Sequence, residues 1–127
     1  MSVSEIIILI LIGLFAGMFS GMFGIGGGLI MVPAMVFFLA MSQHSAQGTS
    51  LGVLVIPVAA IAAYNYYKAG ELNIKYALII AMSFMIGGYF GSNISLGFSE
   101  VMLKRIFGVL MLLMAIRLIF FTKGTTN

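Results

Sequence analysis

Charged side chains are scarce in this sequence: they make up 7% of its 127 residues, and none of them is Asp. Cysteine and tryptophan are also absent. The lack of cysteine excludes disulfide bonds and Cys-based zinc clusters. With one His and no Asp, almost no acid–base pair for catalysis can be assembled, so we expect no enzyme.

Hydrophobic residues are correspondingly abundant and make up 62% of the chain. Soluble domains are about 45–50% apolar and about 25% charged. This composition therefore excludes a soluble globular domain, a disordered chain and a nucleic-acid binder. The net charge of +3 rests on few groups and forms no basic patch for phosphates. We predict an integral membrane protein of one domain, residues 1–127, in a lipid bilayer.

Polar breaks divide the chain into five apolar stretches. A helix needs about 20 residues to cross a bilayer, and four of the stretches approach that length. The predicted fold class is all-α: a polytopic transmembrane helical bundle with four to five membrane segments, followed by a polar tail at 123–127. The second stretch is short and forms a half-helix, a re-entrant segment or a thin crossing. The stretches are Ile6–Phe23, Leu29–Met41, Leu51–Tyr67, Ile74–Ile94 and Leu103–Phe121.

Local signals place several helix ends. Ser2 and Glu5 have the spacing of a capping box, and Asn73 is suited to cap the helix that follows it. Residues 42–48 are predicted to be a polar connector, after which Thr49 or Ser50 caps the next helix. In this reading His44 lies in a solvated connector.

Proline and charge add two expectations about the spans. Pro57 lies inside an apolar stretch and should kink the helix by leaving the Val53 carbonyl without its partner. Lys68, Lys75 and Lys123 favour a cytoplasmic side for the 68–75 loop and the C-terminus by a small margin. Insertion in both orientations stays open.

Three glycines recur every four residues in the first stretch, at Gly13, Gly17 and Gly21. They share one helix face, and such a smooth face lets another helix approach closely. Close helix packing is the favoured interpretation of this face.

Gly24, Gly26, Gly27 and Gly28 place four glycines within five residues. This composition makes a poor helix interior, and unwound backbone at membrane depth is tolerated only beside protein or a water-filled cavity. The segment therefore predicts a break whose free N–H groups favour an anion. A tight turn without a ligand is the alternative. No nucleotide motif follows, so no cofactor is expected.

Asn65 and the Ser92–Asn93 pair are polar residues within apolar stretches. Hydrogen bonding between helices is the favoured interpretation for each of them. Asn65 is also a weaker candidate for an anion site.

Four pieces of the sequence, in order, resemble the TauE/SafE family of membrane anion transporters. They are Gly17-x-x-x-Gly21-x-x-Gly24-x-Gly26-Gly27-Gly28-x-x-x-Val32-Pro33, Ala46-x-Gly48-Thr49-Ser50-Leu51, Tyr67-Lys68-x-Gly70-Glu71-Leu72 and Gly87-Gly88-x-x-Gly91. Family members usually hold two copies of such a unit, whereas this sequence shows one. It therefore looks like a half-length member.

The resemblance implies a multi-pass protein of the cell (inner) membrane that transports sulfite, a sulfonate or a related anion. We expect a homodimer, because a single set of four or five helices hardly surrounds a cavity. A structural or accessory subunit and a small anion channel remain the alternatives. The residues predicted to bind the anion are Gly24, Gly26, Gly27 and Gly28 through their backbone, Thr49 and Ser50 through their hydroxyls, and Asn65.

Overall fold

The computed structural model describes residues 1–24 and 26–121, and the predicted polar tail lies outside these residues. The described residues form helices and no strands, in agreement with the predicted all-α class. The six helices are α1 (Val3–Phe23), α2 (Gly28–Phe38), α3 (Gln43–Val55), α4 (Ala60–Lys68), α5 (Ile74–Leu96) and α6 (Glu100–Phe120).

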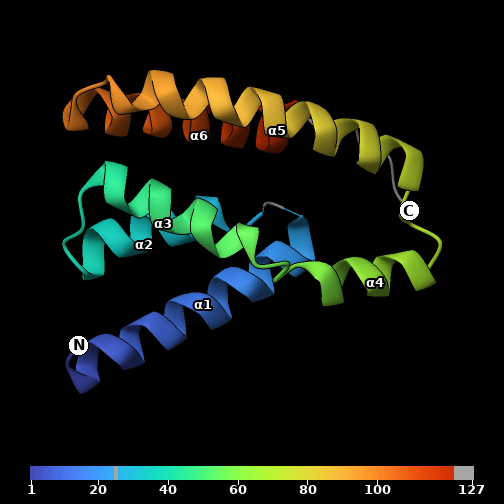
Figure 1. Ribbon diagram of the computed structural model, residues 1–127, viewed down its shortest axis with the longest axis horizontal. Helices are drawn as coiled ribbons and strands as arrows, with labels where there is room; N and C mark the ends of the chain where they lie inside the picture. Colours follow the sequence, from blue (N-terminus) through green and yellow to red (C-terminus); the bar gives the residue numbers. More distant parts are fainter. Residues whose placement is uncertain (25, 122–127) are drawn as a thin grey trace.

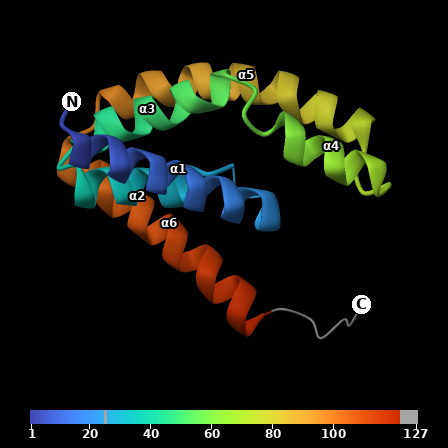
Figure 2. The same cartoon turned by 90° about the horizontal axis from the view of Figure 1, so that it is seen from below.

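The helices form two groups (Figure 1). Helix α2 packs against α1 and α3, and α4 continues from α3, while α5 and α6 form a hairpin that contacts α3 through α6. The two arms of this hairpin diverge from their shared turn (Figure 2). In both views the N-terminus, the α2–α3 connection and the α5–α6 turn lie at one end of the molecule. The 68–73 loop lies at the other end.

Side-chain caps set four helix starts. The side chains of Ser2 and Asn73 accept from the N–H groups of Glu5 and Tyr76, as predicted. Ser99 accepts in the same way at the start of α6. The prediction that Thr49 or Ser50 caps a helix is wrong. Ser42 is the cap of α3, and the expected polar connector 42–48 forms the first turns of that helix.

Pro57 interrupts the third apolar stretch, as predicted. Steric clash with a proline ring disfavours helical backbone at the preceding residue. Ile56 accordingly takes φ −74° and ψ 124°, so α3 ends at Val55. Helix α4 resumes at Ala60, and the two helices are bent by 53°. The bend carries the start of α4 toward the end of α1.

We expect Pro57→Ala to reduce this bend, because it restores a backbone donor and removes the restriction on Ile56. Nitroxide labels on cysteines at Leu51 and Tyr67 would report the change. The distance between the labelled backbone positions should approach about 24 Å, the length of sixteen residues of continuous helix. Val58→Ala, which keeps the proline, should leave the distance unchanged. An equal distance in both variants would show that Pro57 does not set the bend.

Two helices, α1 and α5, are long and apolar enough to cross a membrane, and the bent pair α3–α4 makes a third candidate. Helix α2 is apolar but has only 11 residues. Helix α6 carries four charged residues: Glu100, Lys104, Arg105 and Arg117. The described chain therefore offers two to three candidate spans by length and composition, and a count of four to five stays a prediction.

Apolar surface is left exposed over most of the chain. The buried core is small and consists of Ala16, Met31, Val32, Met35 and Ala46, which join α1, α2 and α3. None of the 23 residues of α5 is buried. Exposed apolar area is unfavourable in water by about 25 cal/mol per Å². The outer faces of these helices thus require lipid or another protein surface.

Candidate functional site

A cleft of about 240 Å³ lies between the second half of α1, the start of α2 and the α3–α4 bend. The small residues of α1 form one wall, and apolar residues around the bend form the other. None of the residues that line it is charged. They are Gly13, Ala16, Gly17, Ser20, Gly21, Gly26, Gly27, Met31, Val53, Leu54, Val58, Ala59 and Ala62.

Within the described chain, the glycine face of α1 lines this cleft, and close packing of this face against a helix of another chain stays a prediction. A Cβ atom added at Gly13 or Gly17 would meet nothing within 4 Å. At Gly21 the added atom would lie 3.9 Å from the Cβ of Ala62, an ordinary contact. Within the described chain, the absence of side chains on α1 therefore makes space for the cleft.

The glycine segment separates α1 from α2 with backbone that favours glycine. Gly24 ends α1 at φ 67°, and Gly26 and Gly27 take φ 74° and 83°. Side chains other than glycine resist these left-handed angles. Helix α1 stops at Phe23 and α2 starts at Gly28. A helix broken within the membrane stays a prediction.

The start of α2 carries free backbone donors. Gly27 is its N-cap residue and has no side chain with which to cap. Among the described residues, the amides of Gly26, Gly27 and Gly28 donate to no acceptor. The first amides of a helix carry partial positive charge, which favours anions. The amides of Gly26 and Gly27 belong to residues that line the cleft.

Ser50 lies near these glycines, but Thr49 does not share its position. Ser50 is buried in the middle of α3, and its Oγ atom would lie 3.4 Å from a Cβ atom added at Gly28. A Cβ atom at Gly28 would therefore make an ordinary contact with the Ser50 hydroxyl. Thr49 is exposed. The predicted pair of hydroxyl donors is thus divided between the interior and the surface.

Five of the predicted site residues do not line the cleft: Gly24, Gly28, Thr49, Ser50 and Asn65. Gly24 is the C-cap of α1, where its N–H donates to the carbonyl oxygen of Ser20 at 2.7 Å. Asn65 is exposed on α4. The neighbouring Tyr66, which the sequence analysis missed, donates its hydroxyl to the Gly21 carbonyl oxygen at 2.7 Å. This bond joins α4 to the last turn of α1, beside the cleft.

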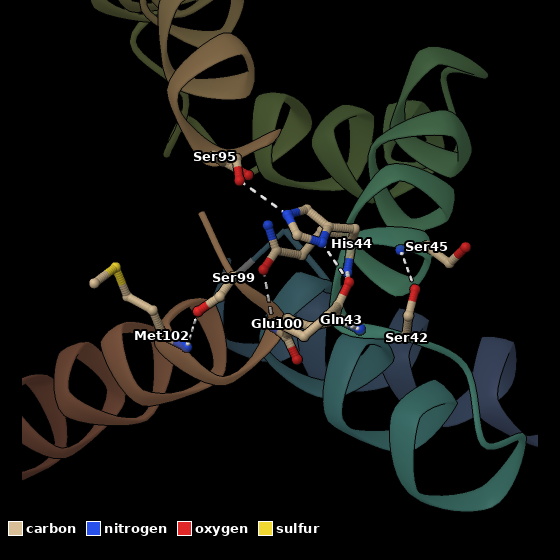
Figure 3. A network of polar contacts seen from close by, with 9 residues as sticks. Ser42, Gln43, His44, Ser45, Ser95, Ser99, Glu100 and Met102 are labelled. Carbon is tan, nitrogen blue, oxygen red and sulfur yellow. Dashed lines mark hydrogen bonds and ion pairs between the residues drawn. The ribbon is translucent and has the colours of Figure 1, made fainter. Parts of the chain in front are cut away.

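A second polar cluster joins α3 to the α5–α6 turn (Figure 3). The carboxylate of Glu100 accepts from the backbone N–H groups of Gln43 at 2.6 Å and His44 at 3.4 Å. It also contacts Nδ1 of the His44 ring, whose Nε2 lies 2.9 Å from the Ser95 carbonyl oxygen. The expectation of a solvated His44 is therefore wrong: its side chain is 22% exposed and bound on both sides.

No sequence signal pairs His44 with Glu100, because 56 residues separate them. Two local signals were available. Residues 43–47 contain neither glycine nor proline, and Ser42 has the side chain of an N-cap. These signals would have placed His44 in the first turn of a helix, where backbone N–H groups attract a carboxylate.

Curated relatives that carry the name of a probable membrane transporter protein exceed this chain in length. One from Xylella fastidiosa (strain Temecula1), named "Probable membrane transporter protein", is 34% identical over 76% of this chain and 37% of its own length. Another from Bacillus subtilis (strain 168), named "Probable membrane transporter protein YunE", is 30% identical over 93% of this chain and 45% of its own. The chain thus spans less than half the length of these relatives.

No solved structure matches the chain. The family described as "Sulfite exporter TauE/SafE" matches residues 9–127, which covers the glycine segment, the cleft and the polar cluster. The four sequence pieces that resemble this family all fall within the match. This chain belongs to the TauE/SafE family of membrane transporter proteins.

Proposed function

We propose that the chain forms the transport unit for a small anion of the sulfite or sulfonate type, with the anion bound at the start of α2. The cleft that brings Gly26 and Gly27 against the glycine face of α1 is the observation that carries this proposal. The matched family description names a sulfite exporter, and sulfite and sulfonates share a compact oxyanion head.

Electrostatics favour an anion in this cleft without a cationic side chain. The amides of Gly26 and Gly27 supply donors in the lining of the cleft, and a helix start carries roughly half a positive charge. Gly28 is not part of that lining, and its amide adds a donor at the same helix start. The low polarity of the lining strengthens each of these interactions. Binding through partial charges holds the anion weakly enough for release, which transport requires. In this proposal Ser50 supplies a hydroxyl donor next to Gly28, and Gly24 orients the segment.

Thr49 and Asn65 stay predicted contributors to the anion site. Neither lines the cleft of a single chain. Both are exposed on the α3–α4 unit. In our proposal, Thr49 and Asn65 line the anion pathway only when a second chain encloses it.

We propose a homodimer in the inner membrane as the working unit. Helix α5 offers a contact face, because no residue of it is buried and added Cβ atoms at Gly87, Gly88 and Gly91 would meet nothing within 4 Å. Such small residues let helices of two chains approach closely.

A cysteine scan along α5 tests the dimer in native membranes. The sequence has no cysteine, so each variant has a single reactive thiol. We expect disulfide-linked dimers at positions that repeat every three to four residues and include the face of Gly88 and Gly91. Glu71→Cys, in the loop before α5, serves as the control that should not crosslink. A scan without periodic crosslinks would overturn the proposed contact face.

Flux in proteoliposomes tests the proposed function. Sulfite and a short alkyl sulfonate should stabilise the purified protein against heat and should cross the membrane at a saturable rate. Chloride at the same ionic strength is the control. If these anions neither stabilise the protein nor cross the membrane, an accessory subunit is favoured. If they cross at a rate that does not saturate, a channel is favoured.

A further inference from the structure

The side-chain contacts that hold the α5–α6 hairpin against α1–α3 gather at its turn, while the chain joins α5 to α4 through the loop at the other end. Helix α5 buries no residue, and α6 buries Leu103 alone, in its first turn. Phe107, one turn later, packs against the core of α1–α3. The contacts of Glu100 and Ser95 with α3 lie at this same end (Figure 3). The polar cluster therefore forms a large part of the attachment.

The partners of the His44 ring determine where its protons lie. The Ser95 carbonyl oxygen can only accept, so Nε2 must carry a proton. The Nδ1 contact with Glu100 then needs a second proton between the two atoms, on either the ring or the carboxyl group. Without that proton, a nitrogen lone pair would face a carboxylate oxygen. The contact thus holds one exchangeable proton.

We propose that His44 and Glu100 form a proton-binding site that fastens the α5–α6 hairpin to the start of α3. When the shared proton leaves to water, the Nδ1 contact becomes repulsive and the turn between Ser95 and Glu100 separates from α3. The two backbone donors of Gln43 and His44 still favour the carboxylate, so the hairpin loosens without detaching.

The surroundings leave the pair to titrate on its own. On α3 the neighbours are the amides of Gln43 and Gln47, and the groove on the α5 side adds Ser92 and Ser95. On α6 the next charged residue is Lys104, which lines a different groove together with Gln43. No second carboxylate contacts His44 in the described part of the chain.

His44 lies in the first turn of α3, at the start of the bent pair that makes the third candidate span. The contact exists only while the shared proton is present, so a rise in pH that removes this proton ends the contact. The hydrogen bond from His44 lowers the pKa of Glu100 below 4.5, so acid weakens the contact only below that value.

Nitrogen NMR of the single histidine tests the proton site directly. The sequence has one His, so ¹⁵N-histidine labelling in lipid nanodiscs gives signals of His44 alone. We expect the titration midpoint that the ring reports to fall in Glu100→Gln, because the carboxylate that shares the proton is lost. Glu71→Gln, a carboxylate outside the cluster, should leave the midpoint unchanged. An equal midpoint in Glu100→Gln and in the unmodified protein would overturn the proposal.

Spin-label distances test the attachment. Labels at exposed Ser45 on α3 and Val101 on α6 should show one narrow distance at about pH 5.5 and a longer, broader one at about pH 9. His44→Gln cannot titrate, so its distance should not respond to pH. An identical response in this variant, or no response in the unmodified protein, would overturn the attachment. Neither measurement depends on transport, so failure here leaves the anion site to be judged by flux.

Discussion

Gly27→Leu is expected to lower anion transport in proteoliposomes by about 5- to 30-fold, with insertion and expression near normal. Gly27 sits at φ 83°, where a side chain costs about 1–2 kcal/mol. A Cβ atom there would also lie 3.0 Å from Cε of Met31. The Met31 tip is flexible and can move away, so the backbone strain decides the effect. Helix α2 would then lose the geometry that presents its free amides.

Two comparisons make this experiment specific. Gly27→Ala carries the same backbone strain with little bulk, so most of the loss should already appear in that variant. Gly52→Leu places the same side chain on α3. A Cβ atom added at Gly52 meets nothing within 4 Å, and Gly52 does not line the cleft. This control should transport normally. Normal transport by Gly27→Leu would show that the glycine segment is only a turn.

Local rules account for the parts of the fold that the sequence predicted. The caps at Ser2 and Asn73 depend on residues three positions apart, and the end of α3 depends on Pro57 and the residue before it. The glycine segment is also local, since three neighbouring residues adopt angles that glycine alone adopts readily. In each case the determining residues lie within a few positions of the feature.

The prediction failed where one local pattern fits two environments. Polar residues 42–48 resemble a connector, yet they begin α3 because Glu100 satisfies the backbone N–H groups of Gln43 and His44. The glycines of α1 fit close packing as well as they fit a cleft wall. Within the described chain, the 53° bend between α3 and α4 places Val58 and Ala59 opposite α1 and leaves a cleft beside these glycines. The spacing of neighbouring residues in the sequence does not predict long-range contacts of this kind.

The second large effect is expected from Gly17→Leu, which fills the cleft while leaving the backbone unstrained. Gly17 lies within α1 and lines the cleft, and an added Cβ atom there meets nothing within 4 Å. A Leu side chain at this position would occupy much of the 240 Å³ and would exclude the anion from the amides of Gly26 and Gly27. We expect anion flux to fall to the level of empty liposomes.

Measurements of stability and assembly distinguish a cleft-filling effect of Gly17→Leu from a role of Gly17 in helix packing. Because the added side chain enters open space, the variant should give the same thermal stability and the same pattern of α5 crosslinks as the unmodified protein. Its stabilisation by sulfite should be lost together with flux. Gly52→Leu is again the matched control, and it should keep both. If Gly17→Leu instead loses its crosslinks while retaining sulfite stabilisation, this face of α1 serves contact between chains, and the anion must bind elsewhere.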